Sequence, residues 1–338
     1  MLYKNTKKIF FMLCIFLLIT LIIYTNEVGS KTIFVDDNTE KDYNSIQRAI
    51  ENASSGDTIF VYSGGYLENI LINKKINLIG ENKNTTIIDG DYNGDVIKIT
   101  ADGVKIQGFK IQSSGTDVNS YGINILSDDN EIYDNKITSN ANGIRIYSSS
   151  GNFLENNSIF YNYYSGLFVN FSNKNIVKNN LVSDNIHNGI LMVGGENNSF
   201  VGNNISSNSN YGFFSEYNSK NNIFYHNNFF DNISKIVDNG SNTWFNSELK
   251  KGNFWSDYLD RYPNSEDKNS DGIWDTAYEI SGDNKDEYPL VENYPNSEKE
   301  IIENGGNKKA NETPGFVFLL TVFAITFYVV FLKKKRKK

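Results

Sequence analysis

The chain is poor in side chains that bind soft metals or form crosslinks. Its 338 residues include one cysteine, two histidines and three methionines. Cys14 lies in an apolar run near the N-terminus, so the rest of the chain has no thiol for a disulfide or a zinc site. Soft copper sites need clustered His, Cys or Met, and His187, His226 and Met192 are scattered. The composition therefore argues against copper, zinc and disulfides.

Positive charge is scarce outside the two ends of the chain. Nine of the 32 lysines and arginines lie in the terminal segments, whereas 39 of the 40 acidic residues lie between residues 31 and 332. That body carries a net charge of −16, which repels a nucleic-acid backbone. We expect no nucleic-acid partner, because cations or neutral sugars suit this field better.

The N-terminus has the organisation of a secretion signal. Lysines at positions 4, 7 and 8 precede an apolar run over residues 9–23, and small residues follow. This pattern predicts a signal peptide over residues 1–30. An uncleaved signal anchor is the alternative.

The C-terminus carries a second apolar run. A polar linker over residues 296–315 leads into a C-terminal transmembrane or sorting segment over residues 316–338, whose apolar part is at the short end of what spans a bilayer. Six basic residues end the chain and should stay in the cytoplasm. We therefore expect a membrane anchor with the body on the extracellular face.

A glycine recurs at a period in the twenties through the middle of the chain. The spacing is 21 residues once and 23 residues three times, and an alternating run follows each glycine. Such a period is typical of a β-solenoid in which one repeat forms one coil. The repeating glycines are Gly122, Gly143, Gly166, Gly189 and Gly212. We predict an all-β fold, a right-handed parallel β-helix with three short strands per coil, and tight corners at these glycines.

A second repeat, Asn-x-apolar-x-x-Asn-x-apolar, is interleaved with the glycines. Four copies begin at Asn130, Asn152, Asn198 and Asn222, and the middle copy is aligned as Ile176-x-x-Asn179-x-Leu181. Alternation then predicts an internal column made of Ile132, Leu154, Ile176, Phe200 and Phe224. Stacked amides should form a corner ladder of Asn135, Asn157, Asn179, Asn203 and Asn227.

The two ends of the solenoid differ from its middle. Ser45 and its neighbours resemble a capping box before an amphipathic turn, so residues 31–240 should form a β-helix with an N-terminal helical cap. Residues 241–295 should form a C-terminal cap segment. Its tryptophans, Trp244, Trp255 and Trp274, suit a cap core, and a sugar platform is their alternative role.

The C-terminal cap segment contains one Asp-rich loop, Asp267-x-Asn269-x-Asp271-Gly272-x-x-Asp275. Oxygen donors at alternate positions around a glycine turn suit Ca²⁺, which takes about six to eight oxygen ligands. The twelfth loop position is Tyr278, so the bidentate Glu of an EF-hand is missing. We expect a structural calcium site at Asp267, Asn269, Asp271 and Asp275, and a solvated acidic turn is the alternative.

Outward positions after the glycines combine aromatic and apolar side chains. They predict a binding surface for sugar rings or a protein partner, made of Arg145, Tyr147, Phe168, Leu191 and Phe214. A covering loop or cap is the alternative.

If the chain is an enzyme that modifies polysaccharides, Arg145 is the candidate catalytic residue. Acids near it in the sequence, which are Asp128, Asp129 and Asp134, fall toward corners. An acid cluster beside Arg145 in a cleft would favour an enzyme, and a flat aromatic stripe would favour binding.

Several segments resemble the opening of NosD-like proteins: 33–37 (IFVDD), 46–50 (IQRAI), 56–62 (GDTIFVY), 65–69 (GYLEN) and 78–81 (LIGE). The later coils are similar to the same family's repeats, so the resemblance covers roughly residues 31–295. It implies a pectin-lyase-like β-helix of the type grouped as carbohydrate-binding and sugar-hydrolysing domains. This fold serves lyases, hydrolases, epimerases, adhesins and inert stalks, so the resemblance does not choose an activity.

The tripeptide Pro314-Gly315-Phe316 and the segments after it resemble the PGF-CTERM sorting signal of archaeal surface proteins. The resemblance implies that an archaeosortase removes the helix and that a lipid anchors the protein, and an ordinary transmembrane anchor is the alternative. We expect a cell-surface protein that binds carbohydrate or envelope components, or acts in adhesion or structure, without catalysis. A polysaccharide lyase or hydrolase is the second hypothesis, and a copper-maturation accessory is disfavoured.

Overall fold

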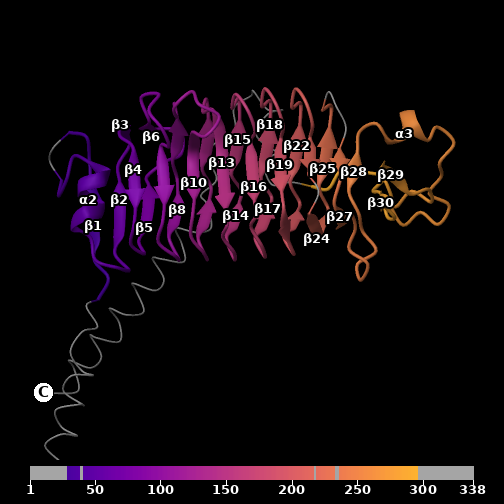
Figure 1. Ribbon diagram of the computed structural model, residues 1–338, viewed down its shortest axis with the longest axis horizontal. Helices are drawn as coiled ribbons and strands as arrows, with labels where there is room; N and C mark the ends of the chain where they lie inside the picture. The colour runs from indigo at the N-terminus through magenta and orange to yellow at the C-terminus, as the bar shows by residue number, and fades with distance from the viewer. Residues whose placement is uncertain (1–28, 39–40, 217, 233–235, 296–338) are drawn as a thin grey trace, which may run out of the picture. The chain divides into compact units, whose positions relative to one another are not determined.

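Regular alternation of inward apolar and outward polar residues builds three sheets around one core (Figure 1). The computed structural model describes residues 29–295 apart from 39–40, 217 and 233–235. Most of the predicted signal peptide, and all of the predicted linker and sorting segment, lie outside these residues. None of the helices described is long and apolar enough to cross a bilayer.

Each coil contributes one strand to each sheet in turn. The first sheet contains β1 (Thr32–Val35), β2 (Thr58–Val61), β5 (Asn77–Gly80), β8 (Lys105–Gln107), β11 (Glu131–Tyr133), β14 (Phe153–Glu155), β17 (Ile176–Lys178), β20 (Gly195–Glu196), β21 (Ser199–Val201), β24 (Ser219–Tyr225) and β27 (Ser241–Thr243). The second contains β3 (Gly64–Leu67), β6 (Thr86–Asp89), β9 (Lys110–Gln112), β12 (Lys136–Thr138), β15 (Ser158–Phe160), β18 (Leu181–Ser183), β22 (Asn204–Ser206), β25 (Asn228–Phe230) and β28 (Phe254–Trp255). The third contains β4 (Ile70–Ile72), β7 (Ile97–Ile99), β10 (Tyr121–Ile125), β13 (Asn142–Tyr147), β16 (Leu167–Asn170), β19 (Ile190–Val193), β23 (Phe213–Ser215) and β26 (Val237–Asp238). These strands pair in parallel, which confirms the predicted right-handed parallel β-helix and gives it about nine turns.

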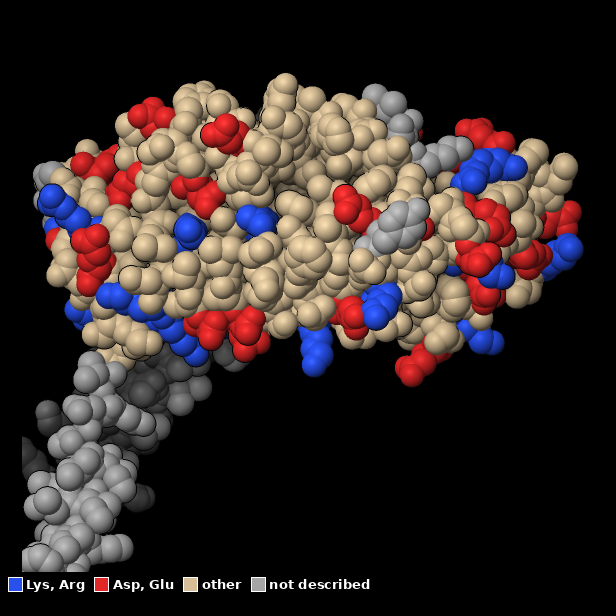
Figure 2. Space-filling model, viewed as in Figure 1, with Lys and Arg blue, Asp and Glu red and all other residues tan. Residues whose placement is uncertain are grey.

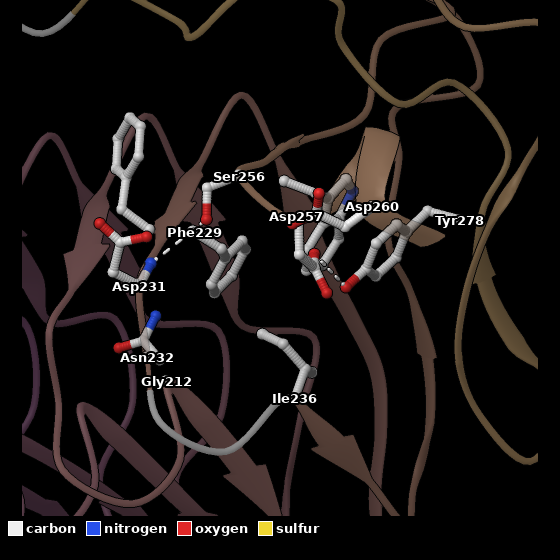
Figure 3. Close-up of a pocket in the computed structure, with 11 residues that line it drawn as sticks. Gly212, Phe229, Asp231, Asn232, Ile236, Ser256, Asp257, Asp260 and Tyr278 are labelled. Atoms are coloured by element: carbon white, nitrogen blue, oxygen red, sulfur yellow. Dashed lines mark hydrogen bonds between the residues drawn. The ribbon is translucent and has the colours of Figure 1, made fainter. Parts of the chain in front are cut away.

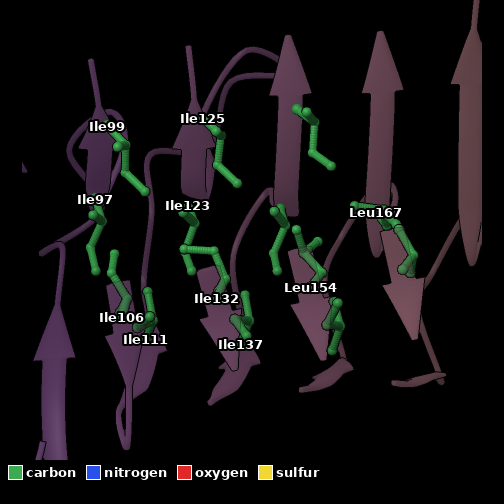
Figure 4. Close-up of a cluster of buried hydrophobic side chains, with 14 of the residues drawn as sticks. Ile97, Ile99, Ile106, Ile111, Ile123, Ile125, Ile132, Ile137, Leu154 and Leu167 are labelled. Carbon is green, nitrogen blue, oxygen red and sulfur yellow. The ribbon is translucent and has the colours of Figure 1, made fainter. Parts of the chain in front are cut away.

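The core consists of apolar columns stacked along the solenoid (Figure 4). The central residues of β8, β11 and β14 are Ile106, Ile132 and Leu154, which pair in register and are fully buried. Burying one such side chain contributes roughly 1.5–3 kcal/mol relative to exposure. Because side chains alternate, a slip of one residue would turn a whole column outward, and the pattern therefore specifies the register.

The middle copy of the asparagine repeat is shifted by one residue from the predicted alignment. Ile176 is 42% exposed, and Val177 is the buried residue of β17. The ladder residue is Asn180 rather than Asn179. Asn175 and Asn180 keep the five-residue spacing of the other copies. An unpaired buried amide costs more than one partly exposed isoleucine, so the asparagines set the alignment and the prediction from the apolar residues was wrong.

Three ladders of asparagine, one at each corner, tie successive coils together. Each asparagine donates from its backbone N–H and from Nδ2 to Oδ1 of the next asparagine along the solenoid, over 2.8–3.2 Å. The ladder between the third and first sheets is Asn130, Asn152, Asn175, Asn198, Asn222 and Asn242. The ladder between the first and second sheets is Asn135, Asn157, Asn180, Asn203, Asn227 and Asn253. The ladder between the second and third sheets is Asn140, Asn162, Asn185, Asn208 and Asn232.

The five repeating glycines leave room for the last of these ladders. None of the five has a positive φ. A Cβ atom at Gly166 would lie 2.7 Å from Asn185 Nδ2, and one at Gly189 would lie 2.7 Å from Asn208 Nδ2. Gly166, Gly189 and Gly212 lie at bends just before a strand, as predicted, whereas Gly122 and Gly143 lie inside strands. Close packing against the corner ladder, rather than a positive φ, is what excludes a side chain.

Helix α2 (Ile46–Asn52) lies at the N-terminal end of the solenoid, as predicted. The Ser45 hydroxyl accepts a hydrogen bond from the N–H of Arg48 at 3.3 Å. The carboxylate of Glu68, from the first coil, accepts the N–H of Ile46 at 2.9 Å. In a capping box the acidic side chain comes from the helix itself, whereas here it comes from the first coil of the solenoid. Its negative charge is favourable at the N-terminus of a helix.

The C-terminal cap ends two ladders on buried carboxyl groups. Asp286 Oδ2 accepts the N–H of Asn253 at 2.7 Å and the indole N–H of Trp255 at 3.0 Å. Asp238 accepts the indole N–H of Trp244 at 2.8 Å and the last amide of another ladder at 2.8 Å. Since ladder amides donate toward the C-terminus, a carboxyl group there supplies the missing acceptor and, when ionised, stabilises the aligned dipoles.

Aromatic stacking fills the rest of this cap, which includes α3 (Tyr258–Arg261) and the hairpin of β29 (Tyr278–Ser281) and β30 (Asn284–Asp286). The ring centroids of Trp255 and Tyr278 lie 4.1 Å apart, and those of Trp274 and Tyr258 lie 5.0 Å apart. The prediction that the tryptophans form a cap core is confirmed.

Removing one ladder amide should destabilise the fold strongly. Asn180→Ala deletes five side-chain hydrogen bonds, leaves the buried backbone N–H of Asn157 unpaired, and leaves Asn157 Nδ2 with only its bond to the carbonyl of Ile132. We expect a loss of about 2–4 kcal/mol in the free energy of unfolding, measured by urea denaturation. The matched control, Asn179→Gly, changes a half-buried neighbour with a φ of 53°, which glycine adopts without strain, and should cost about 1 kcal/mol or less. Equal losses for the two variants would contradict the ladder's role.

The stability contributed by Asp286 should depend on pH. Burial raises the pKa of this carboxyl group to about 7, against the lowering effect of the hydrogen bonds it accepts. The folded protein then holds the proton more tightly than the unfolded chain, so this contribution falls as pH rises from about 4 to about 7. Urea unfolding of the wild-type chain and of Asp286→Asn at several pH values tests this prediction. The free energy of unfolding of the wild-type chain minus that of the variant should fall across that pH window. If that difference in the free energy of unfolding grew with pH, the folded protein would not hold the proton of Asp286 more tightly than the unfolded chain.

Candidate functional site

The third sheet presents an outward column that stays partly open to solvent. Arg145 on β13 pairs in register with Phe168 on β16, and Leu191 and Phe214 continue the column on β19 and β23. These four side chains are half-buried, and Tyr147 at the end of β13 is 37% exposed. The structure therefore gathers the predicted surface residues on one face. Figure 2 shows a side of the solenoid whose middle is largely uncharged, with charged residues toward its ends and lower border.

Arg145 is held among aromatic rings on this face. Its guanidinium carbon lies 4.0 Å from the ring centroid of Tyr147, 5.1 Å from that of Tyr121 and 5.9 Å from that of Phe168. A guanidinium packed on ring faces is attracted by their negative quadrupole and is less free to move. Arg145 Nε is buried and has no hydrogen-bond partner within the described residues.

Asp95 is the acidic neighbour of Arg145, and the sequence analysis missed it. Its Oδ2 accepts a hydrogen bond from Asn124 Nδ2 at 2.7 Å, and its Oδ1 accepts the N–H of Tyr121 at 3.0 Å. Burial raises the pKa of Asp95, while these hydrogen bonds and the charge of Arg145 oppose that rise. The coil here is 26 residues long, so Lys98 pairs in register with Asn124. Aligning the sequence with this coil length could have placed Asp95 near Arg145.

The acids considered from the sequence lie elsewhere. Asp129 and Asp134 are exposed corner residues with positive φ, and Asp134 pairs with Lys83 at 2.6 Å. Asp128 is exposed in the same corner as Asp129. The sequence placed these three acids toward corners, and the structure confirms it.

A cavity of about 270 Å³ lies where the last coils meet the C-terminal cap (Figure 3). The hydroxyl of Tyr278 donates to Asp257 Oδ1 at 2.8 Å, and Ser256 Oγ accepts the N–H of Asp231 at 3.2 Å. Burial raises the pKa of Tyr278, as does the neighbouring carboxylate of Asp257. The walls of this cavity also include the carboxyl groups of Asp231, Asp257 and Asp260.

The Asp-rich loop folds around its own backbone. Asp267 Oδ1 and Asn269 Oδ1 both accept the N–H of Asp271, at 3.1 and 3.3 Å. Asp275 Oδ2 accepts the N–H of Lys268 at 3.2 Å at the base of the loop. Within the described residues, no three His, Cys, Asp or Glu side chains gather closely enough to hold a metal ion. The calcium assignment is not tested by this arrangement and stays a prediction.

The soft donors of the described residues do not fit a copper site. His226 stacks on Tyr294 with ring centroids 4.2 Å apart, and its burial lowers its pKa. Met192 is fully buried, and its sulfur accepts a hydrogen bond from Asn222 Nδ2 at 3.4 Å. His187 is exposed at another corner. Copper needs such donors to converge on one point, and these three do not.

Known proteins resemble this chain in sequence or in fold. The model of a family described as periplasmic copper-binding protein (NosD) matches residues 50–259. A pectin methylesterase from carrot has 13% identity and a TM-score of 0.47 over 67% of this chain and 92% of its own. The periplasmic alginate epimerase AlgG has 14% identity and a TM-score of 0.39, over 62% and 53%. An alginate lyase from Paenibacillus sp. str. FPU-7 has 13% identity and a TM-score of 0.33, over 62% and 99%. No curated protein matches the sequence.

Proposed function

The chain belongs to the NosD family, and we propose that it is a cell-surface protein that binds carbohydrate or another envelope component without modifying it. The family is described as periplasmic, which agrees with a body outside the cytoplasm. Anchoring through residues 316–338 is part of the proposal and rests on the sequence. The anchor is either a retained helix or a lipid attached after an archaeosortase has acted at Pro314-Gly315-Phe316.

Unpaired buried polar atoms on the third sheet carry this proposal. Arg145 Nε, Asn124 Oδ1 and Asn170 Oδ1 have no hydrogen-bond partner within the described residues. Such atoms are rare and costly in folded proteins, and a ligand that supplies donors and acceptors gains free energy here when the half-buried side chains of Arg145 and Asn170 turn toward it. Sugar hydroxyls supply both, and the apolar face of a sugar ring can pack on Phe168 and Tyr147.

A polysaccharide-modifying enzyme is the second candidate, because Asp95 lies near Arg145. A hydrolase commonly uses two carboxyl groups on opposite sides of the scissile bond, and the charged partner of Arg145 on this face is the single Asp95. The cavity at the C-terminal cap is lined by other residues and includes neither Arg145 nor Asp95. Binding is therefore favoured. A copper-maturation role is disfavoured by the scattered donors.

Incubation with a polysaccharide panel separates the two candidates. The purified full-length chain should retain one or more polymers without shortening them, and Arg145→Ala should weaken retention by about tenfold or more. Arg145→Lys keeps the charge but loses the planar fork and the stacking, so it should recover only part of the binding. Both variants should keep the wild-type melting temperature. If the polysaccharides are shortened, and the shortening is lost in the Arg145 variants, the binding proposal is wrong and the chain is an enzyme.

Calcium on the Asp-rich loop is a separate proposal with its own test. The oxygens of Asp267 and Asn269 already converge on one backbone N–H, which supports a common ligand point. Calcium at about 100 times its dissociation constant adds roughly 2.7 kcal/mol to stability and should raise the melting temperature of the full-length chain. Asp271→Asn should abolish this shift, and magnesium should not reproduce it. If calcium leaves the melting temperature unchanged, the loop is a hydrogen-bonded acidic turn and not a calcium site.

A further inference from the structure

Unequal connections between the second and third sheets form a groove. Only three residues join β12 to β13, whereas eight residues join β9 to β10 and six join β15 to β16. The short connection, residues 139–141, therefore lies as a floor between two longer loops. The groove has a volume of about 490 Å³, within the usual range for ligand sites.

Tyrosine dominates the lining of this groove. Tyr161 and Tyr163 are 60% and 58% exposed, and Tyr92 on the opposite wall is 69% exposed. Tyr164 lies beside Tyr163, with ring centroids 4.9 Å apart and planes at 87°. We call this feature the tyrosine groove; it is lined by Tyr92, Ser114, Gly115, Thr116, Ser139, Asn140, Ala141, Tyr161, Tyr163, Tyr164 and Ile186.

Backbone hydrogen bonds hold the walls to the floor. The N–H of Tyr163 donates to the carbonyl of Asn140 at 2.9 Å, and that of Tyr164 donates to the carbonyl of Ala141 at 2.7 Å. On the other side, the N–H of Ala141 donates to Ser114 Oγ at 2.8 Å. Asn140 is itself a ladder residue, so the groove is built on the most constrained part of the coil. A preformed groove binds with little loss of conformational entropy.

Charge narrows the class of ligand. None of the residues that line the tyrosine groove is charged, although the body as a whole carries −16. Asp91 and Asp117, each next to a lining residue in the sequence, are exposed but are not part of the lining. Anionic chains would meet a repulsive field with no local counter-charge, and a basic peptide would find no carboxylate inside the groove. Aromatic faces edged with hydroxyl groups suit a ligand that is apolar on its face and polar at its edge.

We propose that the tyrosine groove binds a neutral glycan chain, with sugar rings stacked on Tyr161 and Tyr163. The site is distinct from the Arg145 surface and does not depend on the function proposed for that surface. It differs in chemistry too, because it offers aromatic faces and hydroxyls without a cation.

Titration calorimetry of the full-length chain tests the inference with β-1,4-linked glucose and mannose hexamers and with a galacturonate hexamer. At least one neutral hexamer should bind more tightly than the galacturonate hexamer. Tyr163→Ala should weaken that binding by about tenfold or more, and Tyr163→Phe should keep most of it because the ring remains. The matched control is Phe171→Ala, an equally exposed aromatic residue of the same coil at the other end of β16, and it should bind like the wild type.

Nitration by tetranitromethane locates the ligand. The bound neutral hexamer should protect Tyr161 and Tyr163, and the half-buried Tyr225 of the first sheet, which belongs to neither proposed site, is the internal control that should stay as reactive as without ligand. Loss of binding in Arg145→Ala but not in Tyr163→Ala would overturn the inference and leave the Arg145 proposal standing. Preference for galacturonate, or no binding of either neutral hexamer, would also overturn it. So would a dimer that Tyr163→Ala converts to a monomer, because the groove would then be an interface between copies.

Discussion

The coils from Asn130 onward are positioned by the asparagine amides at their corners. A buried amide can accept from the coil behind and donate to the coil ahead, so a column of them is satisfied only when it is continuous. Apolar columns supply most of the burial energy, but apolar contacts are non-directional and tolerate sliding. Hydrogen bonds of 2.8–3.2 Å do not, and the ladders therefore set the register to which strands, glycines and caps conform.

Because the ladders and the core take the inward positions, the outward positions are free to differ from sheet to sheet. The first sheet carries ion pairs between adjacent coils, such as Lys105–Glu131 and Lys178–Glu155, which are partly exposed and add little stability. The third sheet carries Arg145 among aromatic rings, and the corner above it carries the tyrosine groove. Two chemically different surfaces thus share one scaffold, and their outward side chains can change without removing a ladder amide.

The mistakes in the sequence analysis follow from the same hierarchy. Alignment of the middle coil on its apolar residues favoured Ile176, although the asparagine spacing placed Val177 inside. The repeating glycines were explained by local backbone preference, although a side chain is excluded there by the space that Asn185 and its equivalents take. In both cases a local preference was weighed without the partner in the next coil. The partner's contribution is larger, because a buried amide without its hydrogen bonds is expensive.

The sequence by itself determined the coil period, the three strands per coil, the helical and aromatic caps and the face that carries Arg145. These features repeat within short windows, and each repeat carries the alternation that turns one side chain inward and the next outward. Tertiary structure alone decided that the charge of Arg145 acts on the carboxyl group of Asp95, that Asp286 ends a ladder, and that unequal corner loops enclose a groove. These contacts join residues one or more coils apart, and their positions depend on how loops of different length stack after winding, which no local pattern encodes.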